Sequence, residues 1–277
     1  MKSTFSGNKI EVSKSDENIL NDRMHIYKCK GIMTKNEFSS LTDEKAFNSQ
    51  RVEIGNTKLI SKNVNTFEML GMNLEAWYYM DEKVSDDKEL LFMRQNTGDG
   101  EVLKVSSENI TKLTMGELTY SEGDKKKKET FPNGVYVLYN GVAVSDYSNW
   151  KIPCKNGSVT LIDNDGDGIY NVLSVINYDE CVVYSKGIDK MIYDLHSATR
   201  NIDASDDNIK IYKDGVLASF DDIKAYDVIS AARTKDGRIV KLIVTNNAVR
   251  GKITEVTKSD TAGYESEVTI NGRKTEK

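Results

Sequence analysis

The chain has 277 residues, of which 38% are hydrophobic and 29% charged, with a formal net charge of −5. This length allows one large domain or two to three small ones. The mild acidity leaves no basic excess to neutralise phosphates, so nucleic acid is not an expected partner. No apolar run reaches the roughly 18 residues that a membrane helix needs, so no membrane insertion is predicted.

Residues 1–22 are polar and are predicted to be a linker or tail. Ser15, followed by Glu17 and Asn18, could begin a short helix that runs to Ile26. The N-terminal stretch lacks the apolar core of a signal peptide. We therefore expect either export without such a signal or a sequence that is a piece of a longer secreted chain.

From His25 onward, short runs of alternating or continuous apolar residues are separated by Gly, Asn, Asp and Ser clusters. This pattern is typical of β-strands joined by turns, and it predicts an all-β fold. Tight hairpins are expected at Asp99-Gly100, Asn140-Gly141, Asp214-Gly215 and Asp236-Gly237. The basic run 125–128 is flanked by acidic residues and is interpreted as a solvated hairpin tip.

A weak internal repeat divides the strand-rich part of the chain. Its units begin at Lys30-Gly31-Ile32, at Lys186-Gly187-Ile188 and at Arg250-Gly251-Lys252-Ile253. The prediction is two to three small β-barrel or sandwich modules in tandem. Their expected ranges are 23–112, 113–184 (a central module), 185–250 (a repeat of the first) and 251–277 (the start of a third). Because this last unit is incomplete, we expect the natural chain to continue beyond Lys277.

The most specific motif is DNDGDG at positions 163–168, which lies between two predicted strands. Carboxylates at the first, third and fifth positions, with a glycine at the sixth, match the way protein loops wrap Ca²⁺. The predicted calcium ligands are Asp163, Asp165, Asp167, the backbone carbonyl of Ile169, and Asn171 either directly or through water.

The loop departs from the helix-flanked calcium loop in one respect. The twelfth position, where such loops carry a bidentate glutamate, is Ser174. The motif is therefore interpreted as an inserted strand-loop-strand calcium site, with affinity in the weak range of about 10⁻⁴ to 10⁻³ M. The alternative is a plain acidic β-turn without metal.

Catalytic motifs are lacking, and the chain is predicted not to be an enzyme. The two histidines, His25 and His196, have no acid or nucleophile placed beside them by a motif. The acidic pairs Asp206-Asp207 and Asp221-Asp222 are expected to be solvated turns, although paired acids also occur in glycosidases.

Cysteines and aromatic residues leave alternatives open. Cys154 and Cys181 could form a disulfide in a secreted protein, or they could be buried free thiols like Cys29. Two aromatic groups, 77–79 and Tyr136/Tyr139/Tyr147/Trp150, could form core and cross-strand pairs or could stack on sugar rings.

Several stretches give the chain a family resemblance. They are ILNDRMHIYKCKGIMTKN, LGMNLEAWYYMDEK, GSVTLIDNDGDGIYNVLSVINYDECVV and IKAYDVISAARTKDGRIVKLIVTNNAVRGKITEV. The chain resembles the β-rich extracellular modules of clostridial-type cell-surface proteins, which are associated with S-layer homology domains. The resemblance covers nearly the whole chain from about Ile19.

The resemblance implies a non-catalytic spacer or assembly module, extracellular in the cell wall or S-layer. Its partners would be other copies or neighbouring domains of the assembly, and cell-wall polysaccharide is a further candidate. The alternative reading is a virion structural protein, such as a phage tail or baseplate component.

Overall fold

The computed structural model describes residues 2–6, 9–13, 18–42, 45–62, 64–81, 83, 85–98, 100–147, 151–207, 209–246, 251–257 and 267–274. The chain forms two compact units. Unit 1 comprises Met1–Asp179 with Ala231–Val240, and unit 2 comprises Glu180–Ser230 with Lys241–Lys277. The finer module boundaries expected from the repeat stay predictions.

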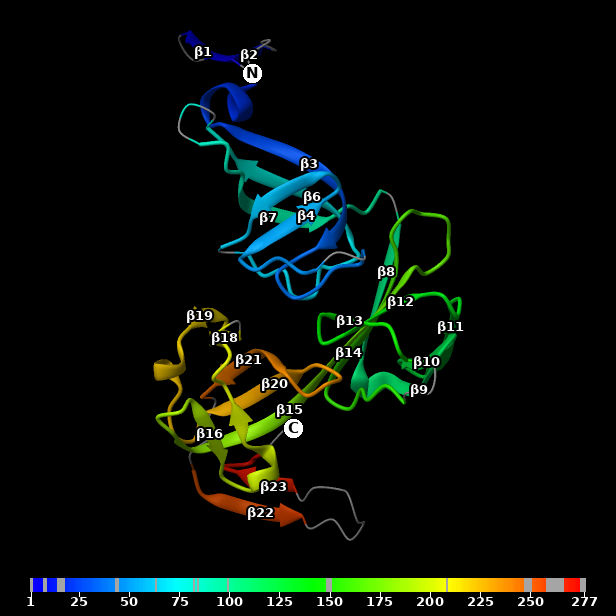
Figure 1. Ribbon diagram of the computed structural model, residues 1–277, viewed down its shortest axis with the longest axis vertical. Coiled ribbons are helices and arrows are strands. Elements are labelled where there is room, and N and C mark those ends of the chain that lie inside the picture. The colour runs from blue at the N-terminus through cyan, green and yellow to red at the C-terminus, as the bar shows by residue number, and fades with distance from the viewer. Residues whose placement is uncertain are drawn as a thin grey trace. The chain divides into compact units, whose positions relative to one another are not determined.

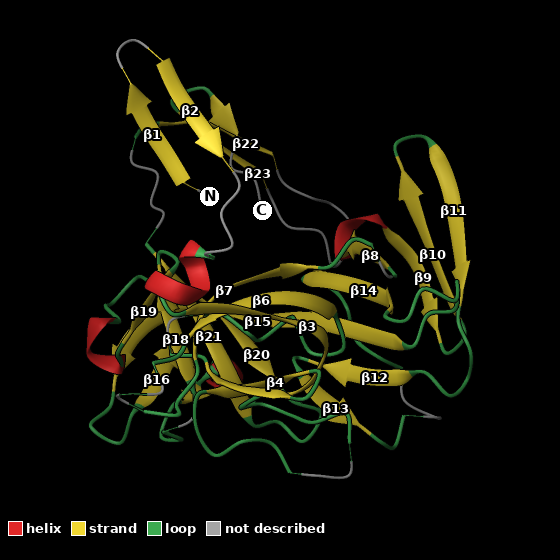
Figure 2. Cartoon of the chain, turned by 90° about the horizontal axis from the view of Figure 1, so that it is seen from above, coloured by secondary structure: helices red, strands yellow, loops and turns green. Residues whose placement is uncertain are grey.

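The predicted all-β fold is confirmed, and strands dominate both units (Figure 2). Helix in the described part of the chain is limited to single turns: η1 (Ile19–Arg23), η2 (Ser107–Asn109), η3 (Ala198–Arg200) and η4 (Phe220–Asp222). The short helix expected up to Ile26 is only the turn η1, because Ile26 already begins strand β3. No described helix has the length and apolarity to cross a bilayer.

The N-terminal part of unit 1 is a closed five-stranded barrel with strand order β3-β4-β5-β7-β6 (Figure 1). Its strands are β3 (Ile26–Lys35), β4 (Arg51–Ile54), β5 (Thr57–Ile60), β6 (Asn73–Tyr79) and β7 (Glu89–Gln95). Alternate side chains fill the interior, as strand periodicity requires. The core is apolar and includes Met33, Val52, Ile54, Leu59, Leu74, Ala76 and Leu90. A separate strand pair, β1 (Lys2–Ser6) and β2 (Lys9–Ser13), precedes the barrel.

The rest of unit 1 is built on β14 (Gly157–Asp163) and the first half of β15 (Val172–Lys186), which pair antiparallel. On one side, β14 pairs antiparallel with β8 (Glu101–Ser106). On the other side, β15 pairs in parallel with β12 (Tyr136–Tyr139). Strand β12 in turn forms a hairpin with β13 (Val142–Val144). The buried side chains of these strands form a second core, including Val137, Val159, Leu161, Leu173 and Val175.

A small three-stranded sheet contains β9 (Ile110–Thr114), β10 (Glu117–Glu122) and β11 (Lys125–Thr130). The prediction that residues 125–128 form the hairpin tip is wrong in detail. These lysines lie on β11, and the turn itself is Gly123-Asp124. Cross-strand ion pairs, such as that from Lys128 Nζ to Glu117 Oε2 at 2.6 Å, explain why a lysine run is tolerated in a strand.

The predicted hairpin at Asp99-Gly100 is also wrong. The strands on either side have different partners, because β7 pairs with β6 and β8 pairs with β14. Asp99 itself lies outside the described residues. A turn dipeptide fixes local chain reversal only, and here the longer-range pairing determines where the strands go.

Unit 2 contains the end of β15 together with strands β16 (Met191–Asp194), β17 (Ile202–Asp203), β18 (Lys210–Lys213) and β19 (Val216–Ala218). Strands β20 (Val228–Arg233) and β21 (Ile239–Thr245) are neighbours, and parts of both belong to this unit. A separate sheet contains β22 (Ile253–Thr257), β23 (Glu267–Ile270) and β24 (Arg273–Lys274). Buried side chains include Val183, Ile192, Ile211, Leu242 and Val244.

Each unit contains the same hairpin arrangement. The predicted hairpins at Asn140-Gly141 and Asp214-Gly215 are confirmed, and all four residues have positive φ, between 49° and 83°. In both hairpins the first strand pairs in parallel with a longer strand, and the first turn residue donates its N–H to that strand. The N–O distances are 2.9 Å for Asn140 to Val175 and 3.0 Å for Asp214 to Val244.

Candidate metal centre

The aspartate loop connects β14 to β15 within unit 1. The two strands pair directly up to the loop, where Ile162 lies opposite Val172 and the Asn171 N–H donates to the Ile162 carbonyl at 2.8 Å. Gly166 and Gly168 have φ values of 80° and 82°, a conformation that glycine adopts without strain. The buried strands therefore close the ends of the loop, and the glycines allow its sharp path.

The three aspartates predicted as ligands come together. Asp163, Asp165 and Asp167 each offer a carboxylate oxygen, and these oxygens all lie within 4.8 Å of one another. Asp163 is only 5% exposed, whereas the other two are exposed. Three close carboxylates repel one another in the absence of a cation. The arrangement is thus chemically suited to a hard cation that prefers oxygen ligands.

Asp163 is held by the backbone of its own loop. Its Oδ1 accepts from the N–H groups of Gly166 at 2.8 Å and Asp165 at 3.3 Å, and its Oδ2 accepts from Gly168 at 3.0 Å. Burial alone would raise the pKa of Asp163, but these backbone donors outweigh it, and the net result is a lowered pKa. The carboxylate is therefore charged at neutral pH, as a metal ligand must be.

The other predicted ligands lie along the same loop. Asp165 Oδ1 accepts from the Asp167 N–H at 3.4 Å, and Asp167 Oδ1 accepts from the Ile169 N–H at 2.8 Å. Asn171 Oδ1 accepts from the Asn164 N–H at 2.9 Å, so this side chain braces the loop. Coordination by Ile169 and Asn171 stays a prediction.

The loop is anchored by contacts that the sequence did not predict. Asn164 Nδ2 donates to the Gly71 carbonyl at 3.0 Å, and Asn73 Nδ2 donates to the Asn164 carbonyl at 3.3 Å. Gly100 lies so close that an added Cβ would be 2.2 Å from the Asp163 carbonyl oxygen. The one local signal was that Asn164, inside the motif, has an amide that can both donate and accept. Gly71 and Asn73 are distant in sequence and carry no motif.

The histidines and paired acids considered as alternative sites have structural contacts. The His25 ring packs edge-on against the Tyr79 ring, and the backbone N–H of His196 donates to the Asp194 carboxylate at 3.0 Å. Asp207 forms an ion pair with Lys190 at 2.9 Å. Asp222 accepts from the Ser219 N–H in a capping box at the start of η4.

The two aromatic groups behave differently. Tyr78 faces the barrel core and stacks on Tyr27 at 5.8 Å, whereas Trp77 lies on the opposite face of the strand, beside Phe92 at 5.6 Å. In the second group Tyr139 is buried, Tyr136 is exposed, and Tyr147 donates to the Val135 carbonyl at 3.0 Å. Trp150 lies outside the described residues. Among the described members of the second group, Tyr139 is therefore a core residue, whereas Tyr136 is open to solvent.

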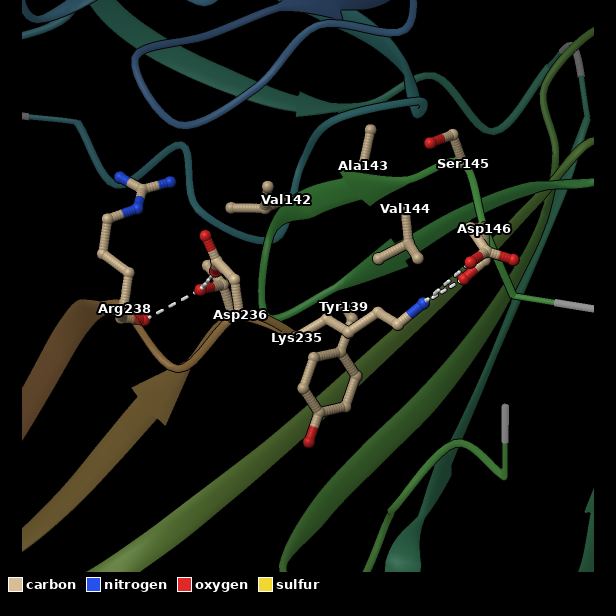
Figure 3. Close-up of a pocket in the computed structure, with 10 residues that line it drawn as sticks. Tyr139, Val142, Ala143, Val144, Ser145, Asp146, Lys235, Asp236 and Arg238 are labelled. Atoms are coloured by element: carbon tan, nitrogen blue, oxygen red, sulfur yellow. Dashed lines mark hydrogen bonds and ion pairs between the residues drawn. The ribbon is translucent and has the colours of Figure 1, made fainter. Parts of the chain in front are cut away.

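A cavity of about 390 Å³ lies between the β12–β13 hairpin and the turn that joins β20 to β21 (Figure 3). Lys235 extends across it and donates to the backbone carbonyl of Asp146, while Thr234 Oγ1 contacts both the Asp236 carboxylate and the Arg238 carbonyl. Burial raises the pKa of Tyr139, which also lines the cavity, to about 12. The Lys235 contact links the turn to the segment that follows β13, and the Thr234 contacts hold the turn itself.

Comparison of the chain with family models, curated proteins and solved structures found no match. The fold and the loop geometry therefore carry the functional argument.

Proposed function

We propose that this chain is a structural, non-enzymatic module of a bacterial cell-surface assembly of the S-layer type, and that its aspartate loop binds Ca²⁺. One observation carries the calcium part of the proposal, whereas the cell-surface part rests on the family resemblance of the sequence. Three carboxylate oxygens lie within 4.8 Å of one another in a loop that is hydrogen-bonded to the first barrel through Asn164. A cation there would bind the folded arrangement and strengthen it.

Calcium suits the loop better than a transition metal. Asp163, Asp165 and Asp167 provide oxygen ligands only, and Ca²⁺ takes six to eight oxygens in flexible geometry. Ile169, Asn171 and water would complete the shell. Without a glutamate at Ser174, the expected dissociation constant is about 10⁻⁴ to 10⁻³ M, in the range of extracellular modules.

A structural role agrees with the contacts of the other candidate groups. The His25 ring packs against Tyr79, and Asp207 pairs with Lys190. Asp222 belongs to the capping box of η4. The partners would be other copies or neighbouring domains of the assembly, and the location would be extracellular. The alternative of a phage tail or baseplate component is distinguished by the neighbouring genes, which would encode other virion proteins.

The calcium proposal is tested by thermal unfolding with and without Ca²⁺. At a Ca²⁺ concentration ten times the dissociation constant, binding adds about 1.4 kcal/mol to the free energy of unfolding. This should raise the melting temperature of the transition that includes unit 1 by roughly 3–6 °C relative to excess chelator. Asp165→Asn should lose most of this shift because it removes one ligand charge.

Asp124→Asn is the matched control, since it removes an acid from another exposed turn, at Gly123-Asp124. This variant should show the same rise in melting temperature with Ca²⁺ as the wild type. An unchanged melting temperature for the wild type, with identical behaviour of Asp165→Asn, would show that the loop is only a turn. Release of soluble fragments from purified peptidoglycan by the wild type would overturn the non-enzymatic assignment.

A further inference from the structure

The outer face of the first barrel carries two rows of side chains that run across β6 and its neighbours β3 and β7. Strand register places Lys28 and Phe92 on either side of Trp77, and Lys30 and Arg94 on either side of Glu75. We call these six residues the Trp77 face. The opposite side of the same strands packs into the barrel core, so these six residues lie on the outer surface of the closed barrel.

The Trp77 face has an excess of positive charge. The Glu75 carboxylate is the common partner of three cations: Lys28 Nζ at 2.5 Å, Arg94 Nη2 at 2.7 Å and Lys30 Nζ at 3.2 Å. One carboxylate neutralises only one of them, which leaves two positive charges on a protein whose formal net charge is −5. The sign of this face is thus opposite to that of the chain as a whole.

Trp77 positions two of these cations. Lys28 Nζ lies 4.7 Å from the centroid of the indole ring, and the Arg94 guanidinium carbon lies 5.2 Å from it. Cation–π contacts of this kind hold flexible side chains near one orientation. Trp77 is therefore a positioning residue, and its ring is already covered by protein groups.

The groups left for a ligand are the cations and the neighbouring phenyl ring. The side chains of Arg94 and Lys30 are 61% and 57% exposed although they are ion-paired, and Phe92 is 55% exposed. Arg94 uses Nε and Nη2 on Glu75. A guanidinium has five N–H donors, so the remaining three can bind a planar carboxylate.

We infer that the Trp77 face binds an acidic polysaccharide whose sugars carry uronate carboxylates. Arg94 and Lys30 take the carboxylate, and the Phe92 ring packs against the apolar C–H face of a sugar. Charge complementarity selects an anionic ligand, and side chains spread over three adjacent strands on the outside of the barrel can contact successive sugars of a polymer. This inference goes beyond the proposed structural role and does not depend on the calcium loop.

The test is binding of polygalacturonate to the full chain, measured by affinity electrophoresis in excess chelator, with neutral dextran as the uncharged polymer. Polygalacturonate should retard the protein, and added salt should weaken the effect. Lys30→Gln with Arg94→Gln should weaken binding at least about tenfold, equivalent to about 1.4 kcal/mol. Phe92→Ser should also weaken binding, because the ring that packs against the sugar is removed. The conservative variant Lys30→Arg, which keeps the positive charge and leaves the Arg94 guanidinium in place, should bind as the wild type does.

The matched control is Lys125→Gln with Lys126→Gln, which removes the same charge from β11. It should bind as the wild type does, and circular dichroism should show that each variant is folded. The inference is overturned if polygalacturonate retards the wild type no more than dextran does, or if the control pair weakens binding as much as the Lys30/Arg94 pair. Equal or tighter binding of single-stranded oligothymidylate would overturn it in favour of a nucleic-acid surface. Because chelator is present throughout, failure of the calcium proposal would leave these results unchanged.

Discussion

Asn164 and Gly71, 93 residues apart in sequence, are joined by a 3.0 Å hydrogen bond from the Asn164 side-chain amide to the Gly71 carbonyl. This bond connects the aspartate loop to the turn that precedes β6 of the first barrel. Since both groups are buried, each needs its partner in the folded state. The base of the loop is consequently fixed to the core of unit 1, whereas residues 165–169 at its tip are exposed.

Asn164→Ala should lower the free energy of unfolding by about 1–3 kcal/mol, because the Gly71 carbonyl would lose a buried donor. Urea unfolding measures this change. Asn109→Ala, which removes an exposed asparagine at the end of η2, is the control and should stay within about 0.5 kcal/mol of the wild type. Equal stability of the two variants would mean that the Asn164–Gly71 bond contributes nothing net.

Gly100→Ala should be more damaging than a glycine replacement in an open turn. Gly100 has φ +111°, and its added Cβ would be 2.2 Å from the Asp163 carbonyl oxygen, so backbone must move. Gly123 also has positive φ, +59°, but its Cβ would meet nothing within 4 Å. Gly123→Ala should lower the free energy of unfolding by about 1 kcal/mol, because alanine is strained in this left-handed backbone conformation. Gly100→Ala should cost several-fold more, and similar unfolding midpoints for the two variants would contradict the close packing of the loop.

The strand content and several turns could be predicted from the sequence because they depend on local pattern. Asn140-Gly141 and Asp214-Gly215 form the expected hairpins, and the alternation of Asp163 with Asp165 and Asp167 does bring three carboxylates together. These features arise from residues a few positions apart. The prediction at Asp99-Gly100 failed because strand partners are chosen by long-range packing.

The same reason explains what was missed at the site and on the barrel. Asn73 and Gly71 reach the loop only through the closure of the barrel, and neither has a residue type that marks it in advance. The rows around Trp77 depend on the register of β3, β6 and β7, which no short motif encodes. A shift of one residue would have placed Trp77 in the core and Tyr78 outside.

Glu75 should make stability depend on acid pH. Hydrogen bonds from Lys28 and then Arg94 lower the pKa of Glu75 to about 2, below the roughly 4.3 of an unfolded chain. Because the pKa of Glu75 is lower in the folded state, its ionised carboxylate stabilises the protein at pH values above the unfolded-state pKa. This contribution is lost as the pH falls from about 4 to about 2. Glu75→Gln should therefore melt at a lower temperature than the wild type at pH 7. The difference in melting temperature between the two proteins should shrink towards pH 2. A difference that stays constant with pH would exclude linkage to the Glu75 carboxyl.

Thiol titration resolves the state of the cysteines. Cys29, Cys154 and Cys181 form no disulfide in the structure, which favours buried thiols over a Cys154–Cys181 bridge. Burial raises the pKa of Cys154 to about 11 and also raises the pKa of Cys29, and Cys181 is buried. Since the thiolate is the reactive form, all three should react slowly with Ellman's reagent at pH 8 in the folded protein. After denaturation without reductant three thiols should titrate at once, and a yield of one would show that two of them form a disulfide.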